Sequence, residues 1–303
     1  MAELKRALAI GVFDGVHTGH GALLERAKQR AEEIGGKPSV LSFDVHPDKL
    51  VRGCDVPLIS NCAARKDIIN RYFGIKDVVF LRFNKRTMEQ PWQEFIENIV
   101  NELNVGWIVV GHDFRCGYKG QGNTERLREY CAEHGIGFDV ISPVTIDGII
   151  VSSSYIRELI LAGEMERANE YLGHPYQLTD TVRPGFHLGT RIGTPTINIY
   201  FEDDALIPKQ GVYASRVFIE DGSEYIAATN VGIRPTVNEG SERISVESFL
   251  LDFSGDLYGK EVRVELHKFI RDEVRFGNPE ELAKQIHRDA ETIKEYFNKK
   301  AED

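Results

Sequence analysis

The chain has 303 residues, of which 42% are hydrophobic and 28% charged, and its formal net charge is −10. This length suits two ordinary domains, and the composition is that of a globular protein with apolar material for two cores. The acidic charge argues against a general nucleic-acid or anionic-membrane binder, because both functions need basic surface. We therefore expect no nucleic-acid partner and no membrane partner, while a local anion pocket stays compatible with the charge.

Apolar runs and cysteines bear on the compartment. No apolar run approaches transmembrane length, and the first apolar segment is too short, and too soon interrupted by Asp14, to be a secretion signal. The four cysteines show no C-x-x-C pairing and no disulfide-framework spacing, so reduced thiols are expected. The sequence thus predicts a cytoplasmic protein. A monomer or a weak homo-oligomer is expected, although neither observation bears on the oligomeric state.

The first half alternates between short apolar segments and amphipathic segments up to about residue 144. This alternation predicts an α/β, Rossmann-like domain with a buried parallel sheet and a ligand crevice at the carboxyl ends of the strands. The expected strands are Leu8–Phe13, Ser39–Phe43, Asp77–Phe83, Trp107–Gly111 and Phe138–Pro143, and the expected helices are Gly21–Ile34, Ala63–Phe73, Trp92–Leu103 and Thr124–His134.

From about residue 177 the pattern changes to apolar–polar alternation without intervening helices, which predicts an antiparallel β-barrel or sandwich. Asp221-Gly222 is a hairpin turn signal, and Pro279 opens a terminal helix. A helical connector over 154–172 joins the halves, so we expect domains at 1–173 and 174–303. The expected strands are Thr196–Phe201, Val212–Ile219, Glu224–Ala228, Ile244–Phe253 and Val262–Ile270, and the terminal helix runs to about Asn298.

The most informative motif is a glycine-rich turn with two histidines, His17 and His20, between the first strand and the first helix. Such a turn presents backbone N–H groups and the positive end of a helix dipole to an anion. The imidazoles add donors where a phosphate would sit, and the segment lacks the Gly-Lys-Ser/Thr of a Walker loop. A nucleotide phosphate site is predicted here, with the nucleotide-binding residues Gly11, Phe13, Asp14, Gly15 and Gly19.

Two alternatives compete for this turn. One is a helix cap with two incidental histidines, and the other is a zinc site completed by Asp44 and His46. Zinc enzymes usually place two histidines four residues apart on a formed helix with a glutamate between them, and neither condition holds here. Phosphate binding is therefore favoured over metal.

A second glycine-rich stretch, Gly111 to Asn123, leaves the carboxyl end of the fourth predicted strand and opens into the same crevice. An ordinary surface loop is the alternative, but functional loops gather at this edge of a parallel sheet. We expect Asp113 in this stretch to contact the nucleotide.

A third stretch, Ser152-Ser153-Ser154-Tyr155-Ile156-Arg157, starts an amphipathic segment. Serines at such a position cap a helix, and their hydroxyls with Arg157 also form an anion cradle. Both interpretations are compatible, so we expect a helix cap and an anion cradle here; the roles of Ser153 as a nucleotide-binding residue and of Arg157 as a catalytic residue are implied by the family resemblance described below.

The β half holds a fourth stretch, which ends in Gly193-Thr194-Pro195-Thr196-Ile197-Asn198. A threonine hydroxyl and an asparagine carbonyl are hard oxygen ligands suited to Mg²⁺ on a nucleotide. A glycine-rich connection between barrel strands is the alternative, and the residues alone leave both open.

Glu247 is the fifth candidate. Strand alternation places Ile244, Val246 and Ser248 on one face, and Ser245, Glu247 and Phe249 on the other. A lone strand glutamate is usually a solvated residue, whereas a carboxylate beside a bound hydroxyl is a candidate general base. The sequence alone does not decide between these two roles.

Together these motifs closely resemble those of the bacterial bifunctional riboflavin kinase/FMN adenylyltransferase (FAD synthetase) family, from about Ala7 to Phe297. The similarity lies in short motifs in the same order across both halves. They are G-x-F-D-G-x-H-x-G-H, F-x-x-H-P (43–47), G-x-D-F-R-x-G (111–117), S-S-S-x-I-R (152–157), L-G-x-P-Y (172–176), G-x-P-T-x-N (193–198), N-x-G-x-R-P-T (230–236) and V-E-S (246–248).

The resemblance implies two reactions and two folds. The second half would be a riboflavin-kinase-like barrel that transfers the γ-phosphoryl group of ATP to riboflavin, giving FMN, with Thr196 and Asn198 holding Mg²⁺-nucleotide and Glu247 accepting the hydroxyl proton. Such transfer needs positioning and charge neutralisation. ATP, riboflavin, FMN and FAD are therefore the expected ligands.

The first half would be the nucleotidyltransferase. There the FMN phosphate would attack the α-phosphorus of a second ATP, giving FAD and pyrophosphate, with His17 and His20 stabilising the α-phosphate and Ser153 and Arg157 holding the β/γ end. The nucleotide-binding set also includes Gly193 in the kinase half, and His46, Arg271 and Phe276 are candidates for flavin contact.

Several residues depart from the family pattern, and most lie in the kinase half. Ile197 replaces a usual alanine and could crowd the kinase nucleotide pocket, since added core volume costs about 1–3 kcal/mol unless it is accommodated. The others include Thr190, Thr194 and Phe249. A single-activity FMN adenylyltransferase with a degenerate kinase half and a non-enzymatic flavin carrier are therefore the alternative functions.

Overall fold

The computed structural model describes residues 4–184, 195–202, 204–235 and 242–302. Contacts between residues divide the chain into two compact units, Met1–Ser153 and Ser154–Asp303. The two helices after residue 152 thus fall in the second unit, whereas the sequence placed them before a boundary at 173/174. Each unit has its own sheet.

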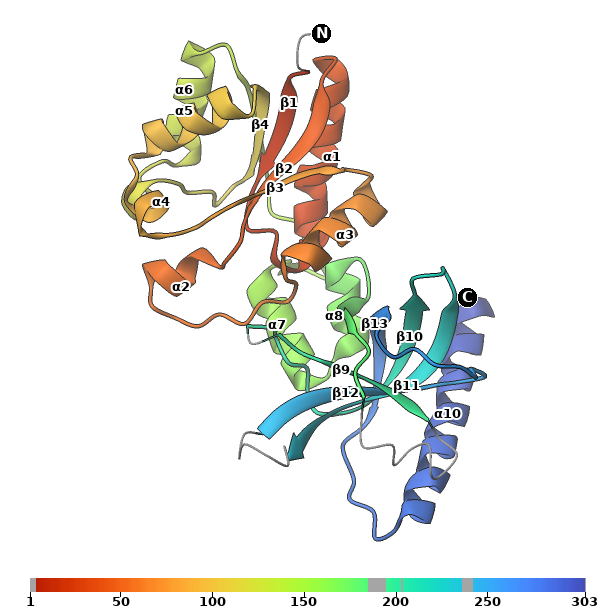
Figure 1. Cartoon of the computed structure of the whole chain (residues 1–303). Helices are drawn as coiled ribbons and strands as arrows, with labels where there is room; N and C mark the ends of the chain where they lie inside the picture. The colour runs from red at the N-terminus through yellow and green to blue at the C-terminus, as the bar shows by residue number, and fades with distance from the viewer. Residues whose placement is uncertain (1–3, 185–194, 203, 236–241, 303) are drawn as a thin grey trace. The chain divides into compact units, whose positions relative to one another are not determined.

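The first unit is built on a five-stranded parallel sheet in the order β3-β2-β1-β4-β5 (Figure 1). The predicted parallel-sheet domain is therefore confirmed. The strands are β1 (Arg6–Ile10), β2 (Lys37–Phe43), β3 (Asp77–Leu81), β4 (Val105–Gly111) and β5 (Gly137–Ile141), followed by a short hairpin of β6 (Thr145–Ile146) and β7 (Ile149–Ile150).

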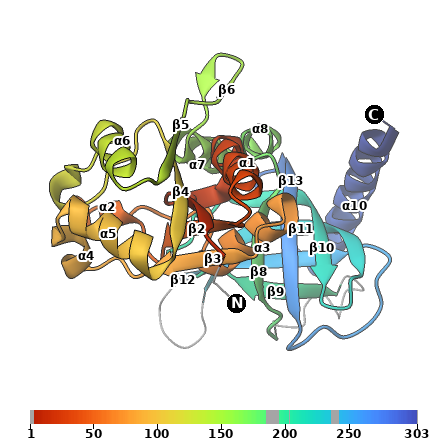
Figure 2. The ribbon, with the colours of Figure 1, turned by 90° about the horizontal axis from the view of Figure 1, so that it is seen from above.

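Helices cover both faces of this sheet because its strands are apolar on both sides. Helices α1 and α3 lie on one side of the sheet, and α5 and α6 lie on the other (Figure 2). The side chains of α1 and α3 pack on Ala9 and Val40, while those of α5 and α6 pack on Leu8 and Leu41. The helical segments are η1 (Asp14–Val16), α1 (Thr18–Glu33), α2 (Pro47–Val51), α3 (Cys62–Phe73), α4 (Lys85–Glu89), α5 (Trp92–Glu102), η2 (Tyr118–Gly120) and α6 (Thr124–Glu133).

The second unit contains a six-stranded antiparallel sheet in the order β8-β13-β10-β11-β12-β9. A bridge between Arg183 and Asn198 joins the segment after β8 to β9, so the two edges of the sheet meet and the sheet curls into a barrel. The predicted antiparallel barrel is confirmed. Its strands are β8 (Tyr176–Thr181), β9 (Thr196–Tyr200), β10 (Gly211–Ile219), β11 (Glu224–Pro235), β12 (Glu242–Leu250) and β13 (Glu261–Arg271).

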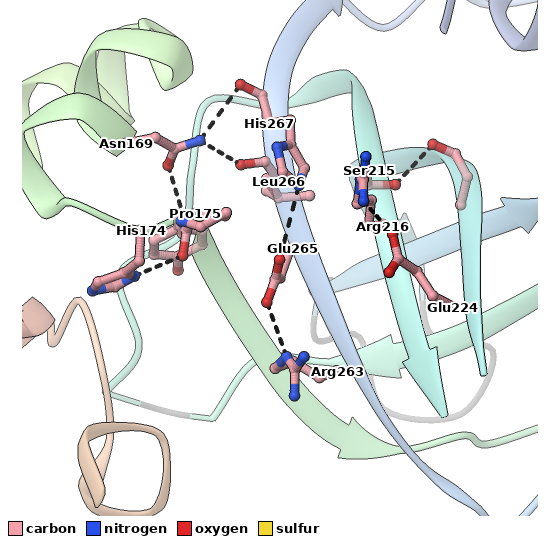
Figure 3. A network of polar contacts seen from close by, with 12 residues as sticks. Asn169, His174, Pro175, Ser215, Arg216, Glu224, Arg263, Glu265, Leu266 and His267 are labelled. Atoms are coloured by element: carbon pink, nitrogen blue, oxygen red, sulfur yellow. Dashed lines mark hydrogen bonds and ion pairs between the residues drawn. The ribbon is translucent and has the colours of Figure 1, made fainter. Parts of the chain in front are cut away.

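Three helices complete this unit: α7 (Ser153–Ala162), α8 (Met165–Leu172) and the terminal α10 (Pro279–Glu302). Ile293 and Phe297 of α10 pack on Ala214 and Ala228, so α10 covers one outer face of the sheet. On α8, the Asn169 amide donates to the Leu266 carbonyl oxygen and accepts from the Tyr176 backbone N–H, both at 2.8 Å, which ties the helix to β13 and β8 (Figure 3).

The structure adds detail to the sequence expectations. The predicted helical connector over 154–172 is confirmed and consists of two helices, because Gly163 has φ +80° and ends the first one. Strand β11 continues beyond Ala228 to Pro235, since pairing with β12 extends through its polar and glycine positions. Strand β8 was not among the expected strands, because its six residues show only a short alternation of apolar and polar side chains.

Candidate functional site

The turn between β1 and α1 has an unusual backbone that buried polar contacts support. Phe13, Gly15 and Val16 have φ values of +54°, +77° and +43°. At the two non-glycine residues such a backbone costs of order 1–3 kcal/mol each, and it concentrates at functional sites. The Asp14 carboxylate accepts from the backbone N–H groups of Ile59 (3.2 Å) and Ser60 (3.0 Å) and thereby anchors the turn.

His17 is the N-cap of α1. Its Nδ1 accepts from the His20 backbone N–H at 3.2 Å, so the proton of the neutral ring is on Nε2. A Cβ at residue 19 would lie 3.1 Å from the His17 ring, which explains why glycine follows the cap at that position. The cap interpretation of His17 is therefore correct, and it leaves Nε2–H as a donor for a ligand.

His20 stacks on His17, with ring centroids 3.6 Å apart and planes inclined by 12°, and contacts the Phe13 ring at 5.1 Å. Burial, then the neighbouring His17, then Arg65 lower the pKa of His20 well below its ordinary value. Its buried Nδ1 has no hydrogen-bond partner within the described residues. Two stacked imidazoles thus lie at the N-terminus of a 16-residue helix, where an anion is favoured.

The other predicted residues of the first unit lie at the same edge of the sheet. Gly11 directly follows β1, and its N–H donates to the Leu41 carbonyl oxygen at 3.1 Å. Asp113 follows β4, the neighbour of β1, and its side chain is 82% exposed. The Ser153 hydroxyl donates to the Asp14 carbonyl oxygen at 3.0 Å, which places this serine at the turn.

The zinc alternative for the turn that carries His17 and His20, here called the histidine turn, requires further metal ligands beside the two histidines. Within the described residues, no group of three or more His, Cys, Asp or Glu side chains is placed to hold a metal ion. The two residues proposed as further zinc ligands have local structural roles: His46 Nδ1 caps α2 by accepting from the Asp48 N–H at 3.2 Å, and Asp44 Oδ1 accepts from the Phe83 N–H at 2.8 Å. Flavin contact by His46 stays a prediction.

In the second unit, cross-strand register aligns three polar candidates with a fourth polar residue, Asn230. Arg271 pairs with Val212, Val212 with Asn230, Asn230 with Glu247, and Glu247 with Asn198, across β13, β10, β11, β12 and β9. Directly opposed residues in an antiparallel sheet project from the same face. The separate sequence candidates Glu247, Asn198 and Arg271 therefore belong to one row, which we call the kinase row, together with Asn230.

The oxygen chemistry of the kinase row is concentrated at Asn198 and Glu247. Asn198 is 3% exposed, and its Oδ1 has no hydrogen-bond partner within the described residues. Thr196 is two residues earlier on β9 and so projects from the same face. Ser245 donates to Glu247 Oε1 at 3.4 Å. A hydroxyl, an amide oxygen and a carboxylate thus occupy adjacent positions.

Arg271 and Phe276 lie next to α10. The Arg271 guanidinium bonds the Asp289 carboxylate, with Nη2 2.7 Å from Oδ2, and its Cζ lies 6.0 Å from the Phe276 ring centroid. Asp289 therefore fixes the orientation of Arg271 at the end of the kinase row. Arg157 is half-buried on α7. Gly193, Thr190 and Thr194 lie outside the described residues.

The structure also locates two departures from the family pattern. Ile197 is buried and projects from the face of β9 opposite to Thr196 and Asn198, so its extra volume is not on the face of the kinase row. Phe249 packs in the apolar cluster under α10, with its ring 6.2 Å from that of His287.

Sequence reasoning missed three residues near the sites: Asn230, Glu273 and Arg65. Asn230 joins the kinase row only through register, and its Nδ2 donates to Glu273 Oε1 at 2.9 Å. Arg65 on α3 is fully buried beneath the histidine turn. No local sequence motif marks Arg65, a single arginine in a helix, or Glu273, a single carboxylate in a loop. Asn230 could have been found, because it begins the N-x-G-x-R-P-T motif.

Comparisons with known proteins agree with this division. A family model described as riboflavin kinase matches residues 172–297, and one described as FAD synthetase matches residues 2–155. Proteins called bifunctional riboflavin kinase/FMN adenylyltransferase are 32% identical in Listeria monocytogenes, over 98% of this chain and 94% of that one, and 34% identical in Haemophilus influenzae, over 96% and 94%. The chain belongs to the bifunctional riboflavin kinase/FMN adenylyltransferase family. The same family name applies to an Escherichia coli relative, 34% identical over 96% of this chain and 92% of that one.

A solved structure has the same fold as this member of the family. It is described as the crystal structure of a macrolide-efflux protein from Streptococcus pneumoniae, and it matches with a TM-score of 0.84 and 28% identity over 97% of this chain and 95% of that one. In the described part of the present chain, no helix is long and apolar enough to cross a membrane.

Proposed function

We propose that this protein phosphorylates riboflavin with ATP to give FMN, and then adenylylates FMN with a second ATP to give FAD and pyrophosphate. The observation that carries the proposal is that each compact unit has its own cluster of side chains whose chemistry suits phosphate transfer. The first unit has stacked imidazoles at a helix N-terminus, and the second has a carboxylate beside hard oxygen ligands. The family membership of both halves supports the same pair of reactions.

In the kinase reaction, Glu247 accepts the proton of the flavin 5′-hydroxyl as that oxygen attacks the γ-phosphorus of ATP, the bond from the γ-phosphorus to the β,γ-bridging oxygen breaks, and ADP leaves. Its position between Asn198 and Asn230 in the kinase row orients the carboxylate toward the face that α10 shares. Phosphoryl transfer depends on positioning and charge neutralisation, and Arg271, held by Asp289, supplies a fixed positive group at the far end of the same row. Flavin contact by Arg271 and Phe276 is part of this proposal.

Residues on β9 fit a magnesium ion carried by the nucleotide. The buried Asn198 Oδ1, with no hydrogen-bond partner in the described segments, and the Thr196 hydroxyl on the same face are the oxygen donors that Mg²⁺ takes alongside phosphates. When bound, the ion would neutralise charge on the phosphate oxygens. The protein's own share is to present both oxygens from a rigid strand whose edge is held by the Arg183–Asn198 bridge.

In the adenylylation reaction, the FMN phosphate attacks the α-phosphorus and pyrophosphate leaves, so no covalent enzyme intermediate is needed. The attacking phosphate is already ionised at neutral pH, and the first unit needs no strong base. His17 donates from Nε2, and His20 adds its ring N–H, where charge develops on the α-phosphate. Ser153 holds the β/γ end, and Gly11, Phe13, Gly15, Gly19 and Asp113 surround the nucleotide. The role of Arg157 at the β/γ end and that of Gly193 at the kinase nucleotide are carried by the sequence motifs alone.

In this proposal Asp14 supports the turn and does not contact the nucleotide directly. Both oxygens of its carboxylate accept backbone N–H groups from the 59–60 segment, so the residue shapes the turn that binds the nucleotide. The protein acts in the cytoplasm, as a monomer or a weak homo-oligomer, and without a nucleic-acid partner.

A product assay tests both reactions. Purified protein is incubated with ATP, Mg²⁺ and either riboflavin or FMN, and the flavins are separated by chromatography. Riboflavin should give FMN and then FAD, and supplied FMN should give FAD. Riboflavin that stays unchanged while FMN becomes FAD would establish the single-activity alternative, and tight flavin binding with neither product would establish a carrier.

A further inference from the structure

A buried arginine joins the three strands beneath the histidine turn. Arg65 on α3 has no exposed surface, and its Nη1 donates to the Val12 carbonyl oxygen (2.9 Å), the Ser42 hydroxyl (2.8 Å) and the Phe43 carbonyl oxygen (2.9 Å). Its Cζ lies 5.3 Å from the ring centroid of Phe80 on β3. A buried guanidinium is costly unless such partners satisfy it, so this arrangement is a specific one.

These contacts lie at the start of the histidine turn. Val12 is the residue before Phe13, whose left-handed backbone starts the turn and whose ring contacts His20. The Ser42 hydroxyl donates to the same Val12 carbonyl oxygen at 2.8 Å. Two donors from neighbouring elements therefore fix the orientation of the peptide group that leads into Phe13.

Arg65 also acts on His20 through charge. After burial and His17, the positive charge of Arg65 is the third cause of the lowered pKa of His20. A neutral imidazole can donate through one ring nitrogen without placing a second cation beside Arg65. The hydrogen bonds of Arg65 to the Val12 carbonyl oxygen favour one orientation of the turn that carries His20, and its charge favours the neutral form of His20.

We infer that Arg65 is a positioning residue for adenylyl transfer, which holds the carboxyl ends of β1 and β2 so that Phe13, His17 and His20 meet the α-phosphate. This inference rests on the proposed function of the first unit. Arg65 is buried and acts through Val12 and the turn, so its effect should appear in the rate of transfer and only weakly in substrate affinity.

The test compares Arg65→Met with Arg65→Lys. An ammonium group has three donors, which match the three oxygens that Nη1 contacts, whereas methionine has none. We expect Arg65→Met to lower kcat for FAD formation from FMN about 100-fold, with KM for ATP and FMN changed less than about 3-fold, and Arg65→Lys to keep kcat within about 10-fold of the parent. Arg71→Met, on the exposed side of the same helix, is the matched control and should leave kcat unchanged.

Riboflavin phosphorylation by the same preparations is the internal reference, because its site lies in the other unit. Parent protein that makes no FAD would refute the proposed function itself. Parent protein that makes FAD, with Arg65→Met equally fast or Arg65→Lys as slow as Arg65→Met, would overturn only the role of Arg65.

A second variant decides the matter if Arg65→Met fails to fold. Ser42→Ala removes one acceptor of Arg65 and one donor to Val12 while leaving the guanidinium its two carbonyl oxygens. We expect it to lower kcat for FAD formation about 3- to 10-fold at unchanged KM. A Ser42→Ala protein with the parent kcat would overturn the inference.

Discussion

Glu247 on β12 and Asn198 on β9 occupy directly opposed positions in the barrel sheet. Their side chains therefore share one face, and the buried Asn198 Oδ1 lacks a hydrogen-bond partner in the described residues. An acceptor oxygen that is buried without a partner costs free energy in the empty site, so a ligand that coordinates it would recover that cost. This is the physical reason to place proton transfer at Glu247 and cation binding at Asn198.

Replacing Glu247 should separate the two activities. Glu247→Gln keeps the size of the side chain but removes the base, so riboflavin phosphorylation should fall by about 10²- to 10⁴-fold. FAD formation from supplied FMN should stay within twofold of the parent, because it takes place in the other unit. Initial rates with each flavin measure both effects, and Glu261→Gln, an exposed carboxylate at the start of β13, is the control. Equal loss of both activities would contradict separate sites.

How much of the kinase row the sequence could predict follows from its geometry. The candidates Thr196, Asn198 and Glu247 were visible because each lies in a local motif on an alternating strand. Their alignment with Asn230 and Arg271 depends on the pairing register of five strands, and a one-residue shift in register would move a side chain to the other face. Register is set by tertiary packing, so residue types alone do not contain it.

The first unit shows the same contrast. The turn around His17 and His20 was predictable because glycine spacing, helix capping and dipole are local properties. Arg65 was not predictable, because an arginine within an amphipathic helix ordinarily lies in solvent, and only the fold shows that this one points under the sheet edge. The helical connector over 154–172 was predictable, but its division into two helices was not, because a glycine such as Gly163 can lie inside a helix or end one, and here it ends one.

His17 has two roles that a single substitution can separate. Asparagine is a strong N-cap, so His17→Asn should preserve the cap on α1 while removing the Nε2–H donor. We expect FAD formation to fall about 10²- to 10³-fold, as for the loss of one preorganised donor to a developing charge, with the free energy of unfolding changed by less than about 0.5 kcal/mol. Kinetics and denaturant unfolding measure the two quantities. A fully active His17→Asn protein would show that His17 is only a helix cap.

Asp14 should behave as a structural residue. In Asp14→Ala the N–H groups of Ile59 and Ser60 lose a charged acceptor in a buried setting, and we expect the first unit to lose about 2–4 kcal/mol of unfolding free energy. Asp14→Asn keeps one acceptor oxygen and should lose about half as much. Both tryptophans, Trp92 and Trp107, lie in the first unit, so their fluorescence follows its unfolding. Unchanged stability with a raised KM for ATP would instead favour direct nucleotide contact.

The last prediction concerns acid stability of the second unit. His267 on β13 is buried against Phe297 of α10, with ring centroids 5.1 Å apart. Burial, with smaller contributions from Lys300 and Arg216, lowers the pKa of His267 to about 3. Glu265 Oε2 lies 3.9 Å from the ring and would favour protonation, but Arg263 engages that carboxylate at 3.0 Å, and burial outweighs the attraction (Figure 3).

The lowered pKa of His267 makes the free energy of unfolding depend on pH. An unfolded chain protonates His267 below pH 6.5, whereas the folded chain keeps it neutral until about pH 3. Between these values the unfolded state binds more protons, so the free energy of unfolding falls as the pH falls, by about 1.4 kcal/mol per pH unit from this group. Calorimetry from pH 7 to 4.5 should show that His267→Leu loses this part of the slope, while His287→Leu, at an exposed position on α10, keeps it. Parallel slopes for His267→Leu and the parent protein would mean that His267 is already protonated in the folded barrel.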